Sequence, residues 1–290
     1  MHKERHNNLE LGIRLTPRSP LLIKSSGISP NPSLPDMQFV RTFVKGIETI
    51  YIPGASLKGV FRSYVEKILR TKKGIDGACD IFDKGKTCAK ETEKELPGNE
   101  IYKNSCLACK MFGSTKLKSR ISFIDAYPSG EIKTETRYGV AISRLTHAVA
   151  QGPFDMEVAV SGSFNSKIYL ENFELWQLGA LALAIRGLND GLIRIGFGKN
   201  RGFGEVAVNI ETIQFTFSSE LPEKEICGIG KIVSEDAANK YGLVGNDIII
   251  IESNPSKTEN EIIYTKREYS PKSWEEISNK AISQLKGILS

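Results

Sequence analysis

Four cysteines in the first half of the chain have the type and spacing of metal ligands, and they lie within about 30 residues of one another. Cys106-Leu-Ala-Cys109 is a CxxC pair, in which one turn presents two thiolates to a single ion. Clustered cysteines in a chain without a secretory signal favour metal binding over disulfides. We therefore predict a closed, tetrahedral, structural zinc site made by Cys79, Cys88, Cys106 and Cys109.

Two alternatives to this site remain open. A CxxC pair is also the redox motif of thioredoxin-like proteins, although no strand–CxxC–helix pattern is evident here. A histidine or a water molecule could replace one of the four thiolates. The fifth cysteine, Cys227, stands apart. A metal ion would give the polar insertion at residues 71–118 the folding nucleus that its few apolar residues do not supply.

A glycine-rich segment, GFGKNRGFG at residues 196–204, is the second motif with a chemical interpretation. It matches neither the Walker A motif nor the GxGxxG motif of dinucleotide-binding proteins. Its glycines permit close approach to a phosphate chain, and Lys199 and Arg201 add positive charge at its tip. The alternative is a tight turn with solvated charges. The combination of glycines and cations favours contact with a polyanion.

The distribution of charge also favours a polyanionic partner. Residues 1–120 contain 22 Lys and Arg but only 12 Asp and Glu, a net charge of +10, whereas residues 121–290 carry a net charge of −5. Such asymmetry is typical of nucleic-acid binding, although solvated surface lysines would produce it too. Lys58 and Arg62 are four residues apart on one face of a predicted helix, where they contact either nucleic acid or solvent.

Catalytic combinations of side chains are scarce. His147 is the only histidine after residue 6, which disfavours hydrolases and ribonucleases that need two histidines. Asp36 lies in a proline-rich segment, residues 16–38, close to Arg41. Loops on a rigid scaffold often carry function, but by residue type alone Asp36 is a turn residue rather than a catalyst.

The elements that must position these residues follow from hydrophobic periodicity. Strands are predicted at residues 9–15, 49–52, 120–127, 156–165 and 205–215, and helices at 57–69, with Ser56 as N-cap, and at 171–188. The order β-α-β-β-α-β predicts an α+β fold with a ferredoxin-like, RRM-like core, in which two helices cover one face of an antiparallel sheet. The other face would remain available for a ligand, as in RNA-recognition domains.

The predicted core covers residues 1–220 and carries two insertions, at 71–118 and at 128–155, of which the second is long, polar and projecting. Residues 221–290 form a C-terminal extension that includes an amphipathic helix near 272–288. No apolar run is long enough to span a membrane, and no apolar stretch follows the charged N-terminus. We therefore expect a cytoplasmic protein without a membrane partner.

Four stretches taken together resemble the RAMP superfamily of CRISPR-associated proteins, and above all the backbone subunits of type III effector complexes. They are IPGASLKGVFR (52–62), CLACKMFGS (106–114), RYGVAISRLTHAVAQGPFDMEVAV (137–160) and GFGKNRGFGEV (196–206). The resemblance covers about residues 8–215, and the last 70 residues find no match. It identifies residues 128–155 with the thumb of such subunits.

The resemblance implies a subunit that stacks along a CRISPR RNA guide beside copies of itself or related RAMP subunits. Its thumb interrupts the pairing of guide and single-stranded target RNA, which is then cut at regular intervals with Mg or Mn. Asp36 stands in the register of the family's catalytic aspartate, although SSGISPNPSLP replaces the family's glycine-rich lead-in. The RNA-binding residues that we infer are Arg41, Lys58, Arg62, Arg144, His147, Gly198, Lys199 and Arg201.

Two other functions remain possible for such a chain. One is a scaffold subunit of the same complex that binds RNA without cutting it, because some relatives lack the aspartate. The other is a CRISPR-RNA processing endoribonuclease from a sister branch, an enzyme class that commonly relies on a histidine. Only His147 is available for that role in the body of this chain.

Overall fold

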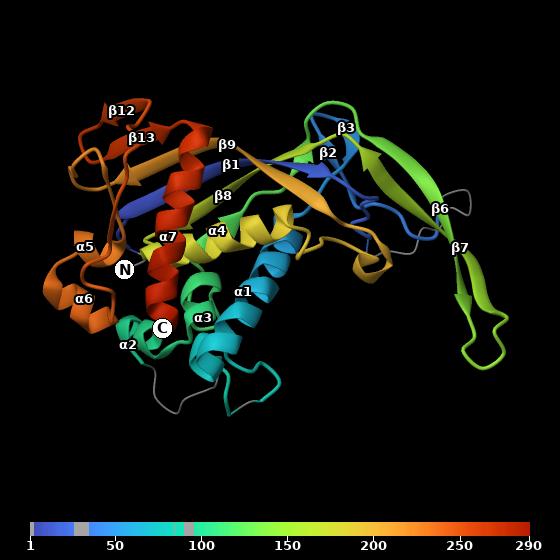
Figure 1. The fold of residues 1–290 in the computed structure, drawn as a ribbon, viewed down its shortest axis with the longest axis horizontal. Coiled ribbons are helices and arrows are strands. Elements are labelled where there is room, and N and C mark those ends of the chain that lie inside the picture. The colour runs from blue at the N-terminus through green and yellow to red at the C-terminus, as the bar shows by residue number, and fades with distance from the viewer. Residues whose placement is uncertain (1–2, 26–34, 84, 90–95) are drawn as a thin grey trace.

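A seven-stranded antiparallel sheet forms the centre of the computed structural model, which describes residues 3–25, 35–83, 85–89 and 96–290 (Figure 1). In spatial order its strands are β12 (Lys257–Asn260), β13 (Thr265–Tyr269), β9 (Val206–Phe217), β1 (Asn7–Pro17), β8 (Phe164–Glu171) and β4 (Ile121–Phe123), with β5 (Tyr127–Pro128) also paired to β8. An antiparallel sheet combined with helices is an α+β architecture, as the sequence predicts.

The two faces of the sheet differ as strand alternation requires. Along β1, Leu9, Leu11, Ile13 and Leu15 are fully buried and point toward the helices. On the opposite face, Arg14 pairs with Glu211 and Lys167 pairs with Glu10, so that charges on neighbouring strands neutralise one another. This second face therefore has less free charge for a ligand than its composition indicates.

Three long helices cover the apolar face: α1 (Gly54–Gly77), α4 (Leu175–Asn189) and α7 (Trp274–Leu289). Helix α4 is apolar on most sides because it lies between the sheet and α7. Gly179 makes this packing possible, since a Cβ there would lie only 2.2 Å from the carbonyl oxygen of Ala281. None of the described helices is long and apolar enough to cross a membrane.

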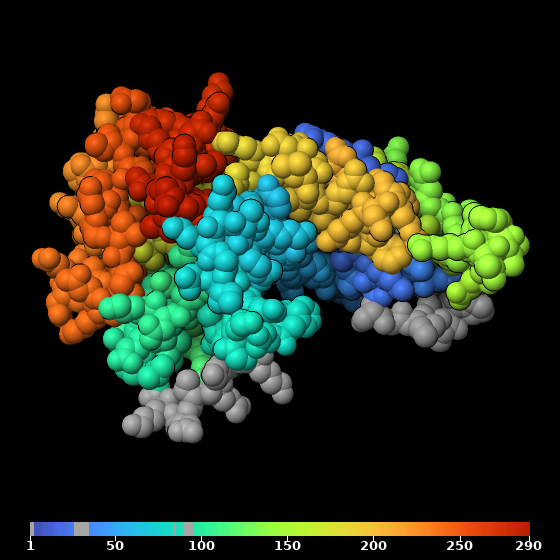
Figure 2. Space-filling model, turned by 60° about the horizontal axis from the view of Figure 1, so that its bottom comes forward, coloured from blue at the N-terminus to red at the C-terminus, as the bar shows by residue number. Residues whose placement is uncertain are grey.

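Short elements and hairpins extend from this core. They are the helices α2 (Gly98–Asn104), α3 (Leu107–Phe112), α5 (Ile229–Ile232) and α6 (Glu235–Tyr241), the 3₁₀ turns η1 (Lys199–Arg201) and η2 (Pro271–Ser273), and the hairpins β2 (Arg41–Val44) with β3 (Ile47–Ile50), β6 (Lys133–Ile142) with β7 (Val149–Ser161), and β10 (Glu225–Cys227) with β11 (Ile248–Ile250). We call β6 and β7 the thumb hairpin. It forms a lobe at the end of the molecule opposite the C-terminal elements (Figure 2).

The strand predicted at residues 156–165 is divided between two strands in the structure. Residues 156–165 contain the end of β7, a turn at Gly162 with φ of 104°, and the start of β8, which continues to Glu171. Helix α4 then begins at Leu175 rather than at residue 171. Pairing with β1 over eight residues keeps β8 extended to Glu171, and the capping box of Glu174 and Gln177 sets the start of the helix. The thumb hairpin accordingly runs beyond residue 155.

The start of α1 also differs from the prediction. The helix begins at Gly54, and Ser56 is not its N-cap. The carboxylate of Asp125 instead accepts the N–H of Gly54 at 2.7 Å. The cap thus comes from a side chain 71 residues away, which no local pattern can reveal. At the other end, α1 continues to Gly77 and therefore enters the insertion predicted at 71–118.

The C-terminal extension is part of the same core rather than an appendage. Strand β13 pairs with β9 and β12 pairs with β13, so residues 257–269 widen the central sheet. Helix α7 packs on α4, and its Ile277, Ala281 and Leu285 are buried. The periodicity of residues 272–288 predicts the terminal helix, and the tertiary structure adds that the helix packs on α4.

A buried polar network joins the extension to the N-terminus of α4. Asp247 is 1% exposed, and its carboxylate accepts the N–H of Leu175. The buried Glu174 accepts the hydroxyl of Tyr102 at 2.6 Å and the N–H of Val244 at 3.1 Å. Burial, together with the charge of Glu174, raises the pKa of Asp247 to about 8.

We predict that this carboxyl makes the stability of the protein fall as pH rises. Because the pKa of Asp247 is higher in the folded than in the unfolded chain, the folded state binds more protons between about pH 4 and pH 8. The contribution of Asp247 to the melting temperature should therefore decrease across this window. The melting temperature of Asp247→Asn, which keeps an acceptor for Leu175, should fall less, or rise more, with pH than that of wild type. Thermal unfolding from pH 5 to pH 9 measures this. The prediction is contradicted if the melting temperature of Asp247→Asn changes with pH as steeply as that of wild type. Asp236→Asn, which replaces an exposed carboxyl, is the control.

Candidate nucleic-acid interface and metal site

The four predicted cysteine ligands converge at the junction of α1 and α3. Cys79 follows the end of α1, Cys88 lies in the next loop, and Cys106 and Cys109 belong to the first turn of α3. All four Sγ atoms lie within 4.8 Å of one another, and those of Cys79 and Cys109 are 3.7 Å apart. Tetrahedral zinc with Zn–S bonds of about 2.3 Å separates its sulfur atoms by about 3.8 Å. The cluster can therefore hold a metal ion such as zinc.

Hydrogen bonds to sulfur support the thiolate form that a metal requires. Cys88 Sγ accepts the N–H of Cys106 at 3.2 Å, and Cys106 Sγ accepts the N–H of Cys109 at 3.4 Å. Hydrogen bonding from Cys106 lowers the pKa of Cys88, whereas hydrogen bonding from Cys106 and Cys88 raises the pKa of Cys109, so the thiols titrate together as one group. Burial raises the pKa of the separate Cys227 to about 11, which keeps that thiol neutral. Convergence of four sulfur atoms favours metal binding over the redox alternative for the CxxC pair.

One flank of α1 faces this cluster. Arg62 donates to Glu66 at 2.7 Å, to the carbonyl oxygen of Gly113 at 3.2 Å and to Cys109 Sγ at 3.8 Å. Burial, and then the neighbouring charge of Arg62, lowers the pKa of the half-buried Lys58. Arg62 thus connects α1 with the cysteine cluster. Contact of Lys58 and Arg62 with RNA stays a prediction.

The other flank of α1 forms a groove with the glycine-rich loop. Two adjoining cavities of about 420 and 320 Å³ lie here, and Val60, Ser63 and Lys199 line both. The groove also includes three cations that the sequence reasoning did not single out: Lys24, Lys67 and Arg194. Lys67 could have been found, because it lies four residues after Ser63 on the same helical face.

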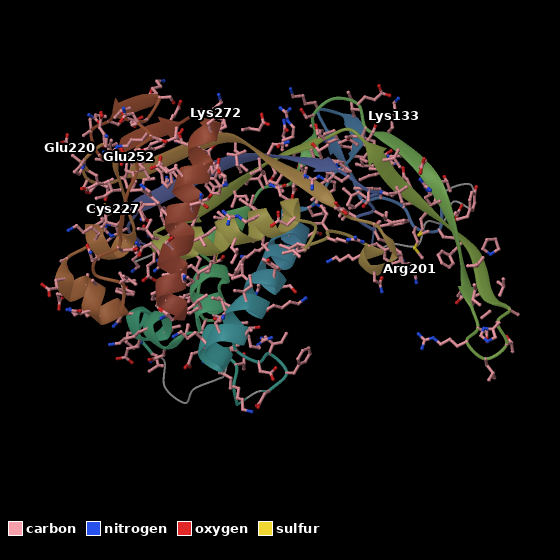
Figure 3. The ribbon with its side chains drawn as sticks, viewed as in Figure 1. Lys133, Arg201, Glu220, Cys227, Glu252 and Lys272 are labelled. Atoms are coloured by element: carbon pink, nitrogen blue, oxygen red, sulfur yellow. The ribbon has the colours of Figure 1, made fainter. Side chains whose placement is uncertain are left out.

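The glycines of the loop have structural roles of their own. Gly198 and Gly202 are left-handed, with φ of 69° and 86° on either side of η1. A Cβ on Gly204 would lie 2.0 Å from the carbonyl oxygen of Ile195. These glycines therefore make a tight turn that exposes Lys199 and Arg201 at its tip. Figure 3 shows Arg201 on this loop, between the helices and the thumb hairpin in that view.

Asp36 is exposed and lies against the base of the thumb hairpin. Its backbone N–H donates to Asp155 Oδ1 at 2.9 Å, and its own carboxylate accepts the N–H of Asp155 at 3.3 Å. Arg41, predicted to bind RNA, forms an ion pair with Glu157 of β7. Asp36 and Arg41 thus both contact strand β7 of the thumb hairpin. The charge of Arg41 is paired with the carboxylate of Glu157.

Arg144 and His147 lie in the exposed turn of the thumb hairpin, between β6 and β7. The hairpin also exposes apolar side chains: Tyr138, Val140, Ile142, Leu145 and Val149. Three of these, Tyr138, Val140 and Ile142, lie on β6 where its pairing with β7 is irregular. Such an exposed apolar surface on a two-stranded hairpin marks an interaction site.

Comparison with known protein families supports these observations. The family model described as RAMP superfamily matches residues 14–207, about two thirds of the chain. The chain belongs to the RAMP superfamily. This membership indicates a CRISPR-related role in RNA binding. The matched region of this chain contains α1, the cysteine cluster, the thumb hairpin and the glycine-rich loop. A comparison with curated proteins gives no match.

We expect the purified protein to contain one zinc ion per chain, because four thiolates at tetrahedral spacing form a closed site. Cys106→Ser should reduce the zinc content well below one and lower the melting temperature, since the ion gives the insertion its nucleus. Elemental analysis and thermal unfolding measure both effects. Cys227→Ser is the matched control and should retain zinc. A zinc-free wild-type protein would refute the assignment.

Proposed function

We propose that this chain is a backbone subunit of a type III CRISPR effector complex, which binds the guide RNA and cuts complementary target RNA. Membership of the RAMP superfamily, together with an exposed aspartate hydrogen-bonded to the base of the thumb hairpin, carries this proposal. We interpret the strand order β9-β1-β8-β4 as the ferredoxin-like core of such a subunit. Its partners would be other effector subunits and copies of itself, assembled in the cytoplasm.

The groove between α1 and the glycine-rich loop is the proposed guide site. Lys199 and Arg201 are exposed at the tip of the loop, and Lys67 is exposed on the facing helix. These cations neutralise phosphates without reading bases, so base pairing between guide and target supplies the specificity. Arg62 and Arg41 have carboxylate partners inside the protein, and we therefore assign them a smaller share of phosphate binding.

The thumb hairpin is the proposed device that interrupts the duplex. Its exposed apolar side chains can contact an unstacked base, while Arg144 and His147 lie at its tip. Displacement of one nucleotide bends the neighbouring phosphodiester toward an in-line geometry, in which the 2′-hydroxyl attacks the adjacent phosphorus. The P–O5′ bond then breaks, which leaves a 2′,3′-cyclic phosphate and a 5′-oxygen that takes up a proton as it leaves. Asp36 then orients that hydroxyl or accepts its proton. A carboxylate oxygen there suits Mg or Mn, which would stabilise the charge on the phosphate.

The non-cutting scaffold and the processing endoribonuclease differ in the residues that they require. A scaffold that binds without cutting has no use for a carboxylate at Asp36. A processing endoribonuclease would rely on His147, which lies in an exposed turn. Among the residues that the structure describes, no buried carboxylate contacts its ring in the way that orients a catalytic histidine. We therefore place the processing enzyme last.

Asp36→Ala should abolish target cleavage by the assembled complex while guide and target binding survive. Loss of a positioned base or orienting group typically lowers the rate by a factor on the order of 10²–10⁴. The measurement is single-turnover cleavage of a labelled complementary RNA with a divalent metal, and wild type should cut it at regular intervals. Asp236→Ala, on the exposed helix α6, is the control. A wild-type complex that binds but never cuts would establish the scaffold instead.

Lys199→Ala and Arg201→Ala should each weaken guide binding and reduce its salt dependence. Loss of one phosphate contact to single-stranded RNA lowers the slope of log K against log salt by about 0.7. The loss should be similar for unrelated guide sequences, because phosphate contacts carry no sequence information. Filter binding over a salt series measures the slope. Lys272→Ala, in the turn before α7 and away from the glycine-rich loop, should leave it unchanged (Figure 3). A strongly sequence-dependent loss would exclude phosphate contact.

A further inference from the structure

The segment that carries Asp36 is attached to the thumb hairpin as an additional strand-like piece. The N–H of Met37 donates to the carbonyl oxygen of Asp155 at 3.1 Å, and the N–H of Glu157 donates to the carbonyl oxygen of Met37 at 2.9 Å. Met37 and Met156 thereby form a parallel bridge. The loop aspartate is therefore held by β7, at the base of the thumb hairpin, and not only by its own neighbours in sequence.

Two carboxylates meet at this junction in a specific way. Asp155 Oδ1 accepts the N–H of Asp36 at 2.9 Å, and Asp36 Oδ2 accepts the N–H of Asp155 at 3.3 Å. Each carboxylate therefore accepts the backbone N–H of the other residue. The side chain of Asp155 thus fixes the backbone of Asp36, and the contact with Asp155 N–H limits the orientation of the Asp36 carboxylate.

A second attachment follows three residues later. Glu157 is 9% exposed, accepts the N–H of Phe39 at 3.1 Å, and forms the ion pair with Arg41. Residues 36–41 are therefore attached to β7 at both ends, by Asp155 and by Glu157. Movement of the thumb hairpin relative to the sheet must carry Asp36 with it.

We propose that Asp155 is a positioning residue for target cleavage: by accepting the N–H of Asp36, its carboxylate sets the loop aspartate in register with the nucleotide that the thumb hairpin displaces. This inference rests on the proposed cleavage function. Misplacement of a reacting group by about 1 Å costs on the order of 10² in rate. Asp155 acts as a hydrogen-bond acceptor here, so its negative charge is not required.

The test compares two substitutions of Asp155 in the assembled complex. Asp155→Ala removes the acceptor and should slow single-turnover cleavage about 100-fold, with target binding unchanged. Asp155→Asn keeps an amide oxygen that can accept the same N–H, and it should cleave within a few-fold of wild type. Glu135→Ala removes a charge from the neighbouring strand β6, without a contact to Asp36, and should cleave normally. If Asp155→Asn is as slow as Asp155→Ala, or if Asp155→Ala cleaves normally, the inference is wrong.

Amide-resolved hydrogen exchange gives a readout that does not depend on cleavage. The amide of Asp36 should exchange faster in Asp155→Ala than in wild type, and at the wild-type rate in Asp155→Asn. Equal exchange in all three proteins overturns the positioning role, whatever their activity. If neither wild type nor Asp36→Ala cleaves the target, the proposed cleavage function fails. Faster exchange of the Asp36 amide in Asp155→Ala, but not in Asp155→Asn, would still show that Asp155 holds Asp36.

Discussion

The packing of α1 against the sheet is the constraint on which the remaining structure depends. Leu57, Phe61, Val65 and Leu69 recur at every fourth position and are buried together. Once this stripe is buried, the helix has two flanks that face in different directions. One flank carries Arg62 to the cysteine cluster, and the other carries Ser63 and Lys67 to the groove with the glycine-rich loop. A metal ion in the cluster would therefore stabilise the same helix that lines the proposed guide site.

The thumb hairpin depends on a different kind of support. A two-stranded hairpin is marginally stable alone, and most of the outer part of this one is exposed. Its base, in contrast, is buried at Met156, Val158 and Ala159, where it meets Leu21 and the segment that carries Asp36. The aspartate and the thumb hairpin are consequently built as one unit. This arrangement suits a reaction in which the hairpin displaces a nucleotide and a carboxylate acts beside it.

The C-terminal elements complete the core rather than add a separate function. Strands β12 and β13 extend the sheet, α7 covers the outer side of α4, and Asp247 and Glu174 connect the extension to the insertion through Tyr102. Buried carboxylates that depend on backbone donors are costly to leave unpaired. This polar network therefore makes the relative placement of three distant segments specific, at the expense of stability at high pH.

Local patterns in the sequence determined the fold class, the apolar stripe of α1, the glycine-rich turn and the four cysteines, because each depends on periodicity or spacing within a short segment. They did not determine the cap of α1, the limits of β8 and α4, or the role of residues 257–289, since those depend on partners far away in the chain. The charged residues show the same division. Arg41 and Lys199 look equivalent in the sequence, but only folding places the carboxylate of Glu157 beside Arg41 and leaves Lys199 exposed. Long-range pairing decides which charges are free to bind RNA, and a linear sequence does not contain that geometry.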